Sequence, residues 1–176
     1  PATYASLPGS ACTLGAEGAF GPDRITHFTY DALGNVTAEH RAYGTAVQQT
    51  YSLASYTWNG ETDWVEDANG NRSDYTYDGF DRLIRINLPQ VTVGVHAASA
   101  GDYEEYGYDN AGNRTSARLR SGEVIGYHYD ALNRVVLKDM PVGDDVVYSY
   151  DLMGNGVFAK FGSAFGYGVM KQFDGF

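Results

Sequence analysis

The sequence predicts an all-β protein made of antiparallel β-hairpin repeats of about 21 residues each. Three observations lead to this prediction. A pattern of the form Tyr-x-Tyr-Asp-x-x-Gly recurs along the chain. Its two tyrosines have the spacing of residues that share one face of a strand, and its aspartate and glycine are typical of a turn.

Each copy of the pattern is identified by its aspartate. Clear copies lie at Asp31, Asp78, Asp109, Asp130 and Asp151, and a weaker copy is centred on Asn59 in the stretch YTWNGETDW. The last three aspartates follow one another at intervals of 21 residues, which is long enough for two strands and two turns. The simplest arrangement is an up-and-down meander of antiparallel strands.

Aromatic residues fill two alternate positions before each turn. Alternate residues of a strand lie on one face, so we expect an aromatic, packed face and an opposite face of small or polar residues. Successive repeats would then stack tyrosine on tyrosine across strands. The predicted ladder consists of Tyr30, Tyr75, Tyr77, Tyr106, Tyr108, Tyr127, Tyr129, Tyr148 and Tyr150, while Tyr56 and Trp58 fill these positions in the weaker copy.

The residues after the tyrosines predict tight turns. An aspartate that opens a turn accepts hydrogen bonds from amides further along, and the fourth position requires a residue that tolerates a left-handed backbone. Asn133 takes that position in one copy, and a second set of turns is expected at Asp67–Gly70, near Gly122 and at 141–144. The predicted turn residues are Asp31, Asp67, Asp78, Asp109, Asp130 and Asp151, with Gly34, Gly70, Gly112 and Gly154.

The repeats define the expected domain organisation. Residues 1–25, rich in Gly, Ala, Ser and Pro, are expected to be irregular or extended, and residues 26–176 to form the repeat array. An insertion near 85–105 is expected to be a surface loop. The last repeat begins again at 173–176 and stops, so we expect the chain to be a fragment whose sheet is completed by flanking repeats.

Composition excludes several classes of protein. The net charge of −10 and the pI of about 4.6 argue against the basic face that nucleic-acid binding requires. Cys12 is the only cysteine, so an internal disulfide is impossible. The sequence shows neither a signal peptide nor an apolar run long enough to span a membrane.

No catalytic, metal or cofactor site is predicted. A carboxylate repeated in every unit performs the same structural task each time, whereas acid–base catalysis needs two carboxylates in one pocket. The four histidines lack metal-ligand spacing. Residues 67–71 resemble the opening of a calcium loop but lack its later glutamate, so a turn is the favoured interpretation.

Sugar binding is a second interpretation of the aromatic residues, because aromatic rings stack on pyranose rings. For the laddered tyrosines we favour a packing role, since a sheet needs a buried face. Aromatic residues outside the ladder, namely Tyr43, Trp64 and Tyr103, are the better candidates for glycan binding.

Several stretches carry a family resemblance. FTYDALGNV, YTYDGFDRLIRI, YGYDNAGNRTS and YHYDALNRVV are similar to the YD repeats of the Rhs family, which occurs in bacterial polymorphic toxins, in the B and C components of insecticidal toxin complexes and in teneurins. The resemblance covers about residues 26–176. It implies a curved or spiralling sheet that is part of a larger hollow shell, which in the toxins encloses a C-terminal toxic domain.

The resemblance leads to two hypotheses about function. The first is a non-enzymatic structural segment of a secreted or cell-surface bacterial protein, whose partners are flanking YD repeats and an enclosed toxin or effector domain. The alternative is an extracellular carbohydrate-binding or adhesive module, able to assemble with other copies through open strand edges.

Overall fold

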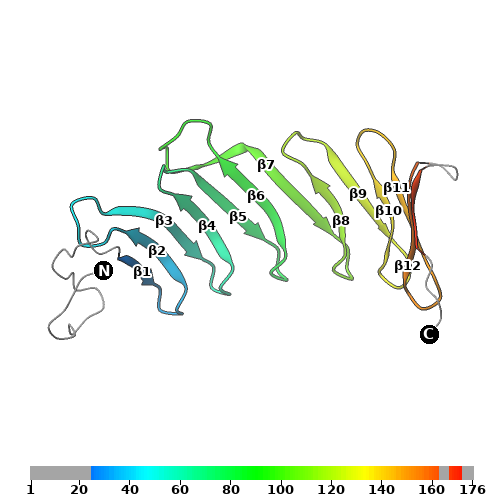
Figure 1. Cartoon of the computed structure of the whole chain (residues 1–176), viewed down its shortest axis with the longest axis horizontal. Coiled ribbons are helices and arrows are strands. Elements are labelled where there is room, and N and C mark those ends of the chain that lie inside the picture. The colour runs from blue at the N-terminus through cyan, green and yellow to red at the C-terminus, as the bar shows by residue number, and fades with distance from the viewer. Residues whose placement is uncertain (1–24, 163–166, 172–176) are drawn as a thin grey trace, which may run out of the picture. The chain divides into compact units, whose positions relative to one another are not determined.

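The computed structural model describes residues 25–162 and 167–171 as one antiparallel sheet (Figure 1). Strands that follow one another in sequence are neighbours, from β1 to β13, and the predicted all-β hairpin architecture is confirmed. The strands are β1 (Thr26–Tyr30), β2 (Val36–Arg41), β3 (Gln49–Tyr56), β4 (Thr62–Asp67), β5 (Arg72–Tyr77), β6 (Leu83–Pro89), β7 (Ala98–Tyr108), β8 (Arg114–Arg118), β9 (Val124–Tyr129), β10 (Val135–Asp139), β11 (Val146–Tyr150), β12 (Gly156–Phe161) and β13 (Gly168–Met170).

The chain divides into two compact units. The first comprises residues up to 82 together with 87–102, and the second comprises 83–86 together with residues from 103 onward. Each unit is built from the same hairpins, with β1–β2 and β3–β4 in the first and β7–β8, β9–β10 and β11–β12 in the second. The expected irregular N-terminal segment, except for residue 25, and the truncated repeat at 173–176 lie outside the described residues.

The described sheet is a single layer and has a very small core. Ala38, Ala117 and Ile125 are its only buried hydrophobic residues among those described, and no large side chain is fully buried. The laddered tyrosines are half-buried except for Tyr30, which is 59% exposed. The aromatic face was expected to be packed, but in the structure it is only half-buried, because the described residues form no second layer to cover it.

Tyrosines of successive repeats do not stack on one another, so that prediction is wrong. The returning strand β8 lies between β7 and β9 and separates their rings by two strand spacings. Arg114, on β8, occupies this gap, with its guanidinium carbon 5.5 Å from the ring centre of Tyr106 and 5.2 Å from that of Tyr127. A cation between two rings takes the place of ring-on-ring stacking.

At four junctions, a tyrosine hydroxyl ties a hairpin to the one before it. Tyr129 donates to the carbonyl of Arg114 at 2.8 Å. The β8–β9 ladder begins at Ser116, so the Arg114 carbonyl lies beyond its end and the hydroxyl supplies the missing donor. The same bond joins Tyr56 to Val36, Tyr108 to Leu83 and Tyr150 to Val135, at 2.8–3.0 Å.

The insertion near 85–105 contains less loop than expected. β6 extends to Pro89 and β7 starts at Ala98, so only residues 90–97 leave the sheet, because most of the additional residues lengthen the two strands. This loop lies against the turn at 67–71. The amide of His96 donates to the carbonyl of Gly70, and its Nδ1 lies 2.7 Å from the carboxylate of Glu66, which is 9% exposed.

Gly70→Ala is expected to destabilise the chain more than Gly34→Ala. Both glycines have positive φ, which costs a residue with a Cβ about 1–2 kcal/mol. A Cβ on Gly70 would also lie 2.9 Å from His96 Cε1, whereas at Gly34 it meets nothing within 4 Å. Displacing His96 from Glu66 adds about 1–2 kcal/mol, measured by urea unfolding. Equal losses in the two variants would show that the loop contributes nothing.

Tyr129→Phe is expected to lower the free energy of unfolding by about 0.5–1 kcal/mol, because it removes the bond to the Arg114 carbonyl while keeping the ring. Tyr127→Phe, on the same strand, is the matched control, since its hydroxyl makes no such bond to a carbonyl in the described residues. Urea unfolding followed by circular dichroism compares the two variants. A loss in the control as large as in Tyr129→Phe would contradict this role.

Candidate functional site

The recurring local structure is a five-residue turn at the end of a hairpin. The amide of its first residue donates to the carbonyl of the fifth, and the amide of the fourth donates to the carbonyl of the first. The fourth residue has positive φ, for example 91° at Gly34 and 59° at Asn133. This is a type I turn followed by a bulge. In the described part of the chain it occurs at 31–35, 57–61, 67–71, 78–82, 109–113, 119–123, 130–134 and 151–155.

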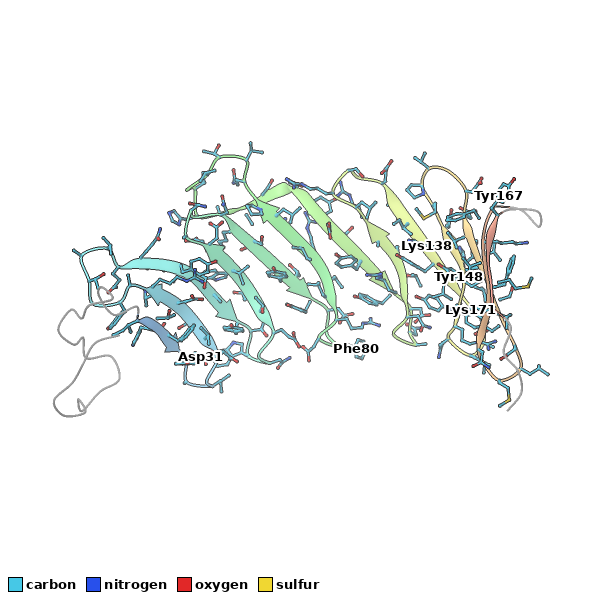
Figure 2. The ribbon with its side chains drawn as sticks, viewed as in Figure 1. Asp31, Phe80, Lys138, Tyr148, Tyr167 and Lys171 are labelled. Atoms are coloured by element: carbon cyan, nitrogen blue, oxygen red, sulfur yellow. The ribbon has the colours of Figure 1, made fainter. Side chains whose placement is uncertain are left out.

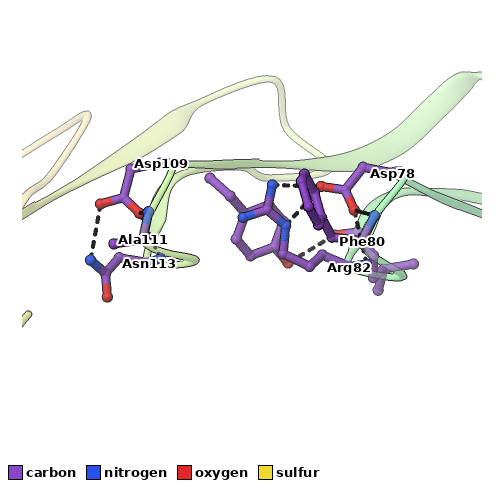
Figure 3. Close-up of polar contacts among 8 residues, drawn as sticks. Asp78, Phe80, Arg82, Asp109, Ala111 and Asn113 are labelled. Atoms are coloured by element: carbon purple, nitrogen blue, oxygen red, sulfur yellow. Dashed lines mark hydrogen bonds and ion pairs between the residues drawn. The ribbon is translucent and has the colours of Figure 1, made fainter.

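The aspartate at the first position binds the rest of the turn with both carboxylate oxygens. In the turn at 109–113, Asp109 Oδ1 accepts from the amides of Ala111 and Asn113 at 2.9 and 2.8 Å (Figure 3). Its Oδ2 accepts from the Asn113 side chain at 2.9 Å. Each of Asp31, Asp67, Asp78, Asp130 and Asp151 holds its own turn in a similar way.

The fifth residue of the turn is a functional position that sequence reasoning missed. In the aspartate turns it is always asparagine or arginine, and its side chain donates to Oδ2 of the aspartate. Arg82, for example, reaches Asp78 at 2.7 Å (Figure 3). The signal was present in the sequence as Asn or Arg four residues after each aspartate: Asn35, Asn71, Arg82, Asn113, Arg134 and Asn155.

The weaker copy begins at Thr57, and its assignment to Asn59 was wrong. The amide of Thr57 donates to the carbonyl of Glu61, and the threonine hydroxyl accepts from the amide of Glu61 at 3.2 Å, as an aspartate oxygen would. The interval from Thr57 to Asp78 is therefore also 21 residues. Trp58 consequently leaves the strand and lies at the turn tip, where it is 98% exposed.

Hydrogen bonding keeps the turn carboxylates ionised. The Asn113 side chain holds the pKa of Asp109 below its usual value of 3.8, and Asn35 does the same to the pKa of Asp31. Arg82 and Arg134 lower the pKa of Asp78 and that of Asp130. These carboxylates stabilise the turns as anions. Because their pKa values are lowered, they stay deprotonated near neutral pH.

The described residues bring together no group of three or more His, Cys, Asp or Glu side chains that could hold a metal ion. His27 and His40 are cross-strand partners, with ring centres 6.1 Å apart. At 67–71, the Asp67 carboxylate accepts from the amides of Asn69 and Asn71. The segment that resembles the start of a calcium loop is therefore one more copy of the turn.

The aromatic residues considered for glycan binding each contact another side chain through the ring. Tyr43 stacks on His27 with ring centres 4.2 Å apart. The guanidinium carbon of Arg72 lies 4.4 Å from the ring of Trp64. Tyr103 meets two guanidinium groups, those of Arg85 and Arg118, at 3.6 and 3.9 Å. This geometry disfavours sugar stacking at the three residues.

Fold and turn together define the class: a single-sheet protein of β-hairpin repeats held by aspartate turns. Residues 108–145 match the RHS repeat family, and the resemblance to the Rhs/YD repeats is thereby confirmed. No curated protein sequence matches the chain. The described residues contain no helix long and apolar enough to cross a membrane.

Solved structures show the same fold. A Tc holotoxin pore from Photorhabdus luminescens matches with a TM-score of 0.65 and 19% identity over 88% of this chain. TcdB2–TccC3 without its hypervariable C-terminal region matches with a TM-score of 0.66 and 19% identity over 84% of this chain. The complex TcdB2–TccC3–Cdc42 matches over 80%, with a TM-score of 0.63 and 19% identity. The match spans only 8–9% of the length of these chains.

Asn113→Ala is expected to raise the pKa of Asp109 toward 3.8, because it removes the donor that contributes most to lowering it. A lowered pKa means that the carboxylate stabilises the fold above the unfolded-state pKa, and that this contribution is lost as pH falls through the folded-state value. The variant should therefore lose less stability on acidification. Carboxyl NMR measures the titration, with Asp31 as internal reference, and an unchanged Asp109 titration would contradict the assignment.

Proposed function

We propose that the chain is a non-enzymatic segment of a β-shell in a larger Rhs-repeat protein, and that this shell encloses a C-terminal toxin or effector domain. The observation that carries the proposal is the single-layered sheet. Each strand pairs only with its neighbours in sequence, and within the described residues β1 and β13 each pair with one strand. Flanking repeats that continue the sheet would pair these edges.

The similar structures support the same reading. They are a Tc holotoxin pore and TcdB2–TccC3 complexes, of which one lacks a hypervariable C-terminal region. By analogy, the partners of this chain are further YD repeats of its own polypeptide and an enclosed domain. A bacterial protein that acts outside the cell that makes it, secreted or at the cell surface, fits this role.

The repeated turns allow a single-layered sheet to be extended one hairpin at a time. Each hairpin adds two strands, so the turns at 109–113, 130–134 and 151–155 fall at one end of the strands in the second unit, and those at 31–35 and 57–61 do so in the first (Figure 1). The turn at 67–71 joins β4 to β5 and therefore lies at the opposite end of the strands. Tyrosine hydroxyls and arginine–aromatic contacts then join neighbouring hairpins. These contacts build a surface of adjustable length without a core of its own.

Protease protection in the full-length parent protein tests the shell. Deleting residues 109–129 removes one whole repeat and joins Tyr108 directly to Asp130, so the strand direction and the turn pattern are kept. Deleting residues 109–118 removes only one strand and reverses the direction of everything that follows. We expect the C-terminal domain to resist protease in the wild type and in the whole-repeat deletion, and to be digested in the single-strand deletion.

Protease sensitivity of the C-terminal domain in the wild type would overturn the proposal. Filament formation by the 176-residue chain that increases with concentration would instead favour the alternative of assembly through the edges at β1 and β13.

A further inference from the structure

Two turns share their first three residues and differ at the fourth and fifth. The turn at 31–35 reads DALGN and the turn at 130–134 reads DALNR. Leu33 and Leu132 occupy the same position in the two turns, and each is 70% exposed. Each turn is followed by the next hairpin of its own unit, so the two surroundings can be compared side chain by side chain.

In the second unit, Arg134 fills the space between two turns. Its Nε and Nη2 lie 2.7 and 2.6 Å from Oδ2 of Asp130, and its guanidinium carbon lies 4.5 Å from the ring centre of Tyr150. Its Nη1 is 3.9 Å from the point where a Cβ on Gly154 would be. The guanidinium therefore lies between the turns at 130–134 and 151–155.

In the first unit the equivalent space is a hollow. The hydroxyl of Tyr56 donates to the carbonyl of Val36 just as Tyr150 donates to Val135, so the two rings are held in the same way. Asn35 is too short to cover the Tyr56 ring, and a Cβ on Gly60 would meet nothing within 4 Å. A hollow of about 240 Å³ remains, lined by Asp31, Ala32, Leu33, Tyr56, Thr57 and Trp58.

The lining of this hollow suits a cation with an apolar stem. Asp31 uses three acceptor sites for Leu33 and Asn35, and a carboxylate has about four. The ring of Tyr56 and the exposed indole of Trp58 present π faces, which attract guanidinium groups. Figure 2 places Asp31 at the turn end of the first hairpin. The neighbouring Leu33 and Trp58 are 70% and 98% exposed.

We propose that the hollow between the turns at 31–35 and 57–61 binds an arginine side chain of a partner polypeptide. The methylene stem of that arginine packs between Leu33 and Trp58, and its guanidinium meets the Tyr56 ring and the Asp31 carboxylate. The chain itself provides the template, since Arg134 makes the same two kinds of contact at Asp130 and Tyr150. This binding site is independent of the proposed shell function.

NMR titration of the 176-residue chain with the peptide acetyl-Gly-Arg-Gly-amide tests the site. We expect saturable shifts at the Trp58 indole and the Gly60 amide, and no saturable shifts with the citrulline peptide, which keeps the shape and loses the charge. Asn35→Arg should abolish binding, because its own guanidinium fills the hollow as Arg134 does in the other unit. Trp58→Ser should weaken binding at least about 3-fold by removing one π face.

Arg134→Asn provides the converse test. It empties the space at 151–155 and should create a second set of saturable shifts there, at Gly154, while the folded spectrum is retained. Binding that survives in Asn35→Arg, equal binding of the citrulline peptide, or shifts confined to other parts of the chain would each overturn the proposal.

Discussion

A single antiparallel sheet has no second layer on which to bury its side chains, and this constraint governs the structure. Because the described residues bury only a very small core, the hydrophobic contribution to folding is small, and the sheet depends on contacts between neighbouring strands. The aspartate turns meet this need locally, because each one satisfies its own backbone groups with a single carboxylate. Repetition then multiplies a small stabilising unit into an extended sheet.

The contacts between hairpins, like the turns, rely on single polar side chains. At four junctions a tyrosine hydroxyl binds a carbonyl of the preceding hairpin, and between the rings of Tyr106 and Tyr127 the side chain of Arg114 fills the gap. Both contacts involve half-buried side chains that serve two purposes, covering apolar surface and pairing polar groups. A sheet built in this way presents side chains on both faces.

The fold followed from the sequence because its signals are local: tyrosine spacing, turn residues and period. The predictions that were wrong concern features that depend on the three-dimensional arrangement of the strands. Thr57 replaces an aspartate with a hydroxyl, so the copy was assigned to Asn59, and Trp58 was assigned to a strand although it lies at a turn tip. Ring stacking failed because the returning strand separates the tyrosines. The hollow beside Asp31 exists because the side chain of Asn35 is shorter than that of Arg134 at the equivalent position. Recognising it requires the structure around both turns.

The tyrosine bond found at four hairpin junctions also has a mechanical consequence. A force that pulls neighbouring hairpins apart across the sheet would break the backbone hydrogen bonds between two strands one pair after another. The hydroxyl bond lies beyond the end of the ladder, at the turn end of the strands, so it would carry load before the first backbone pair separates there. Strand separation that starts at this end would thus meet a tyrosine hydrogen bond at each of these four junctions, which favours stepwise unfolding over a single cooperative loss.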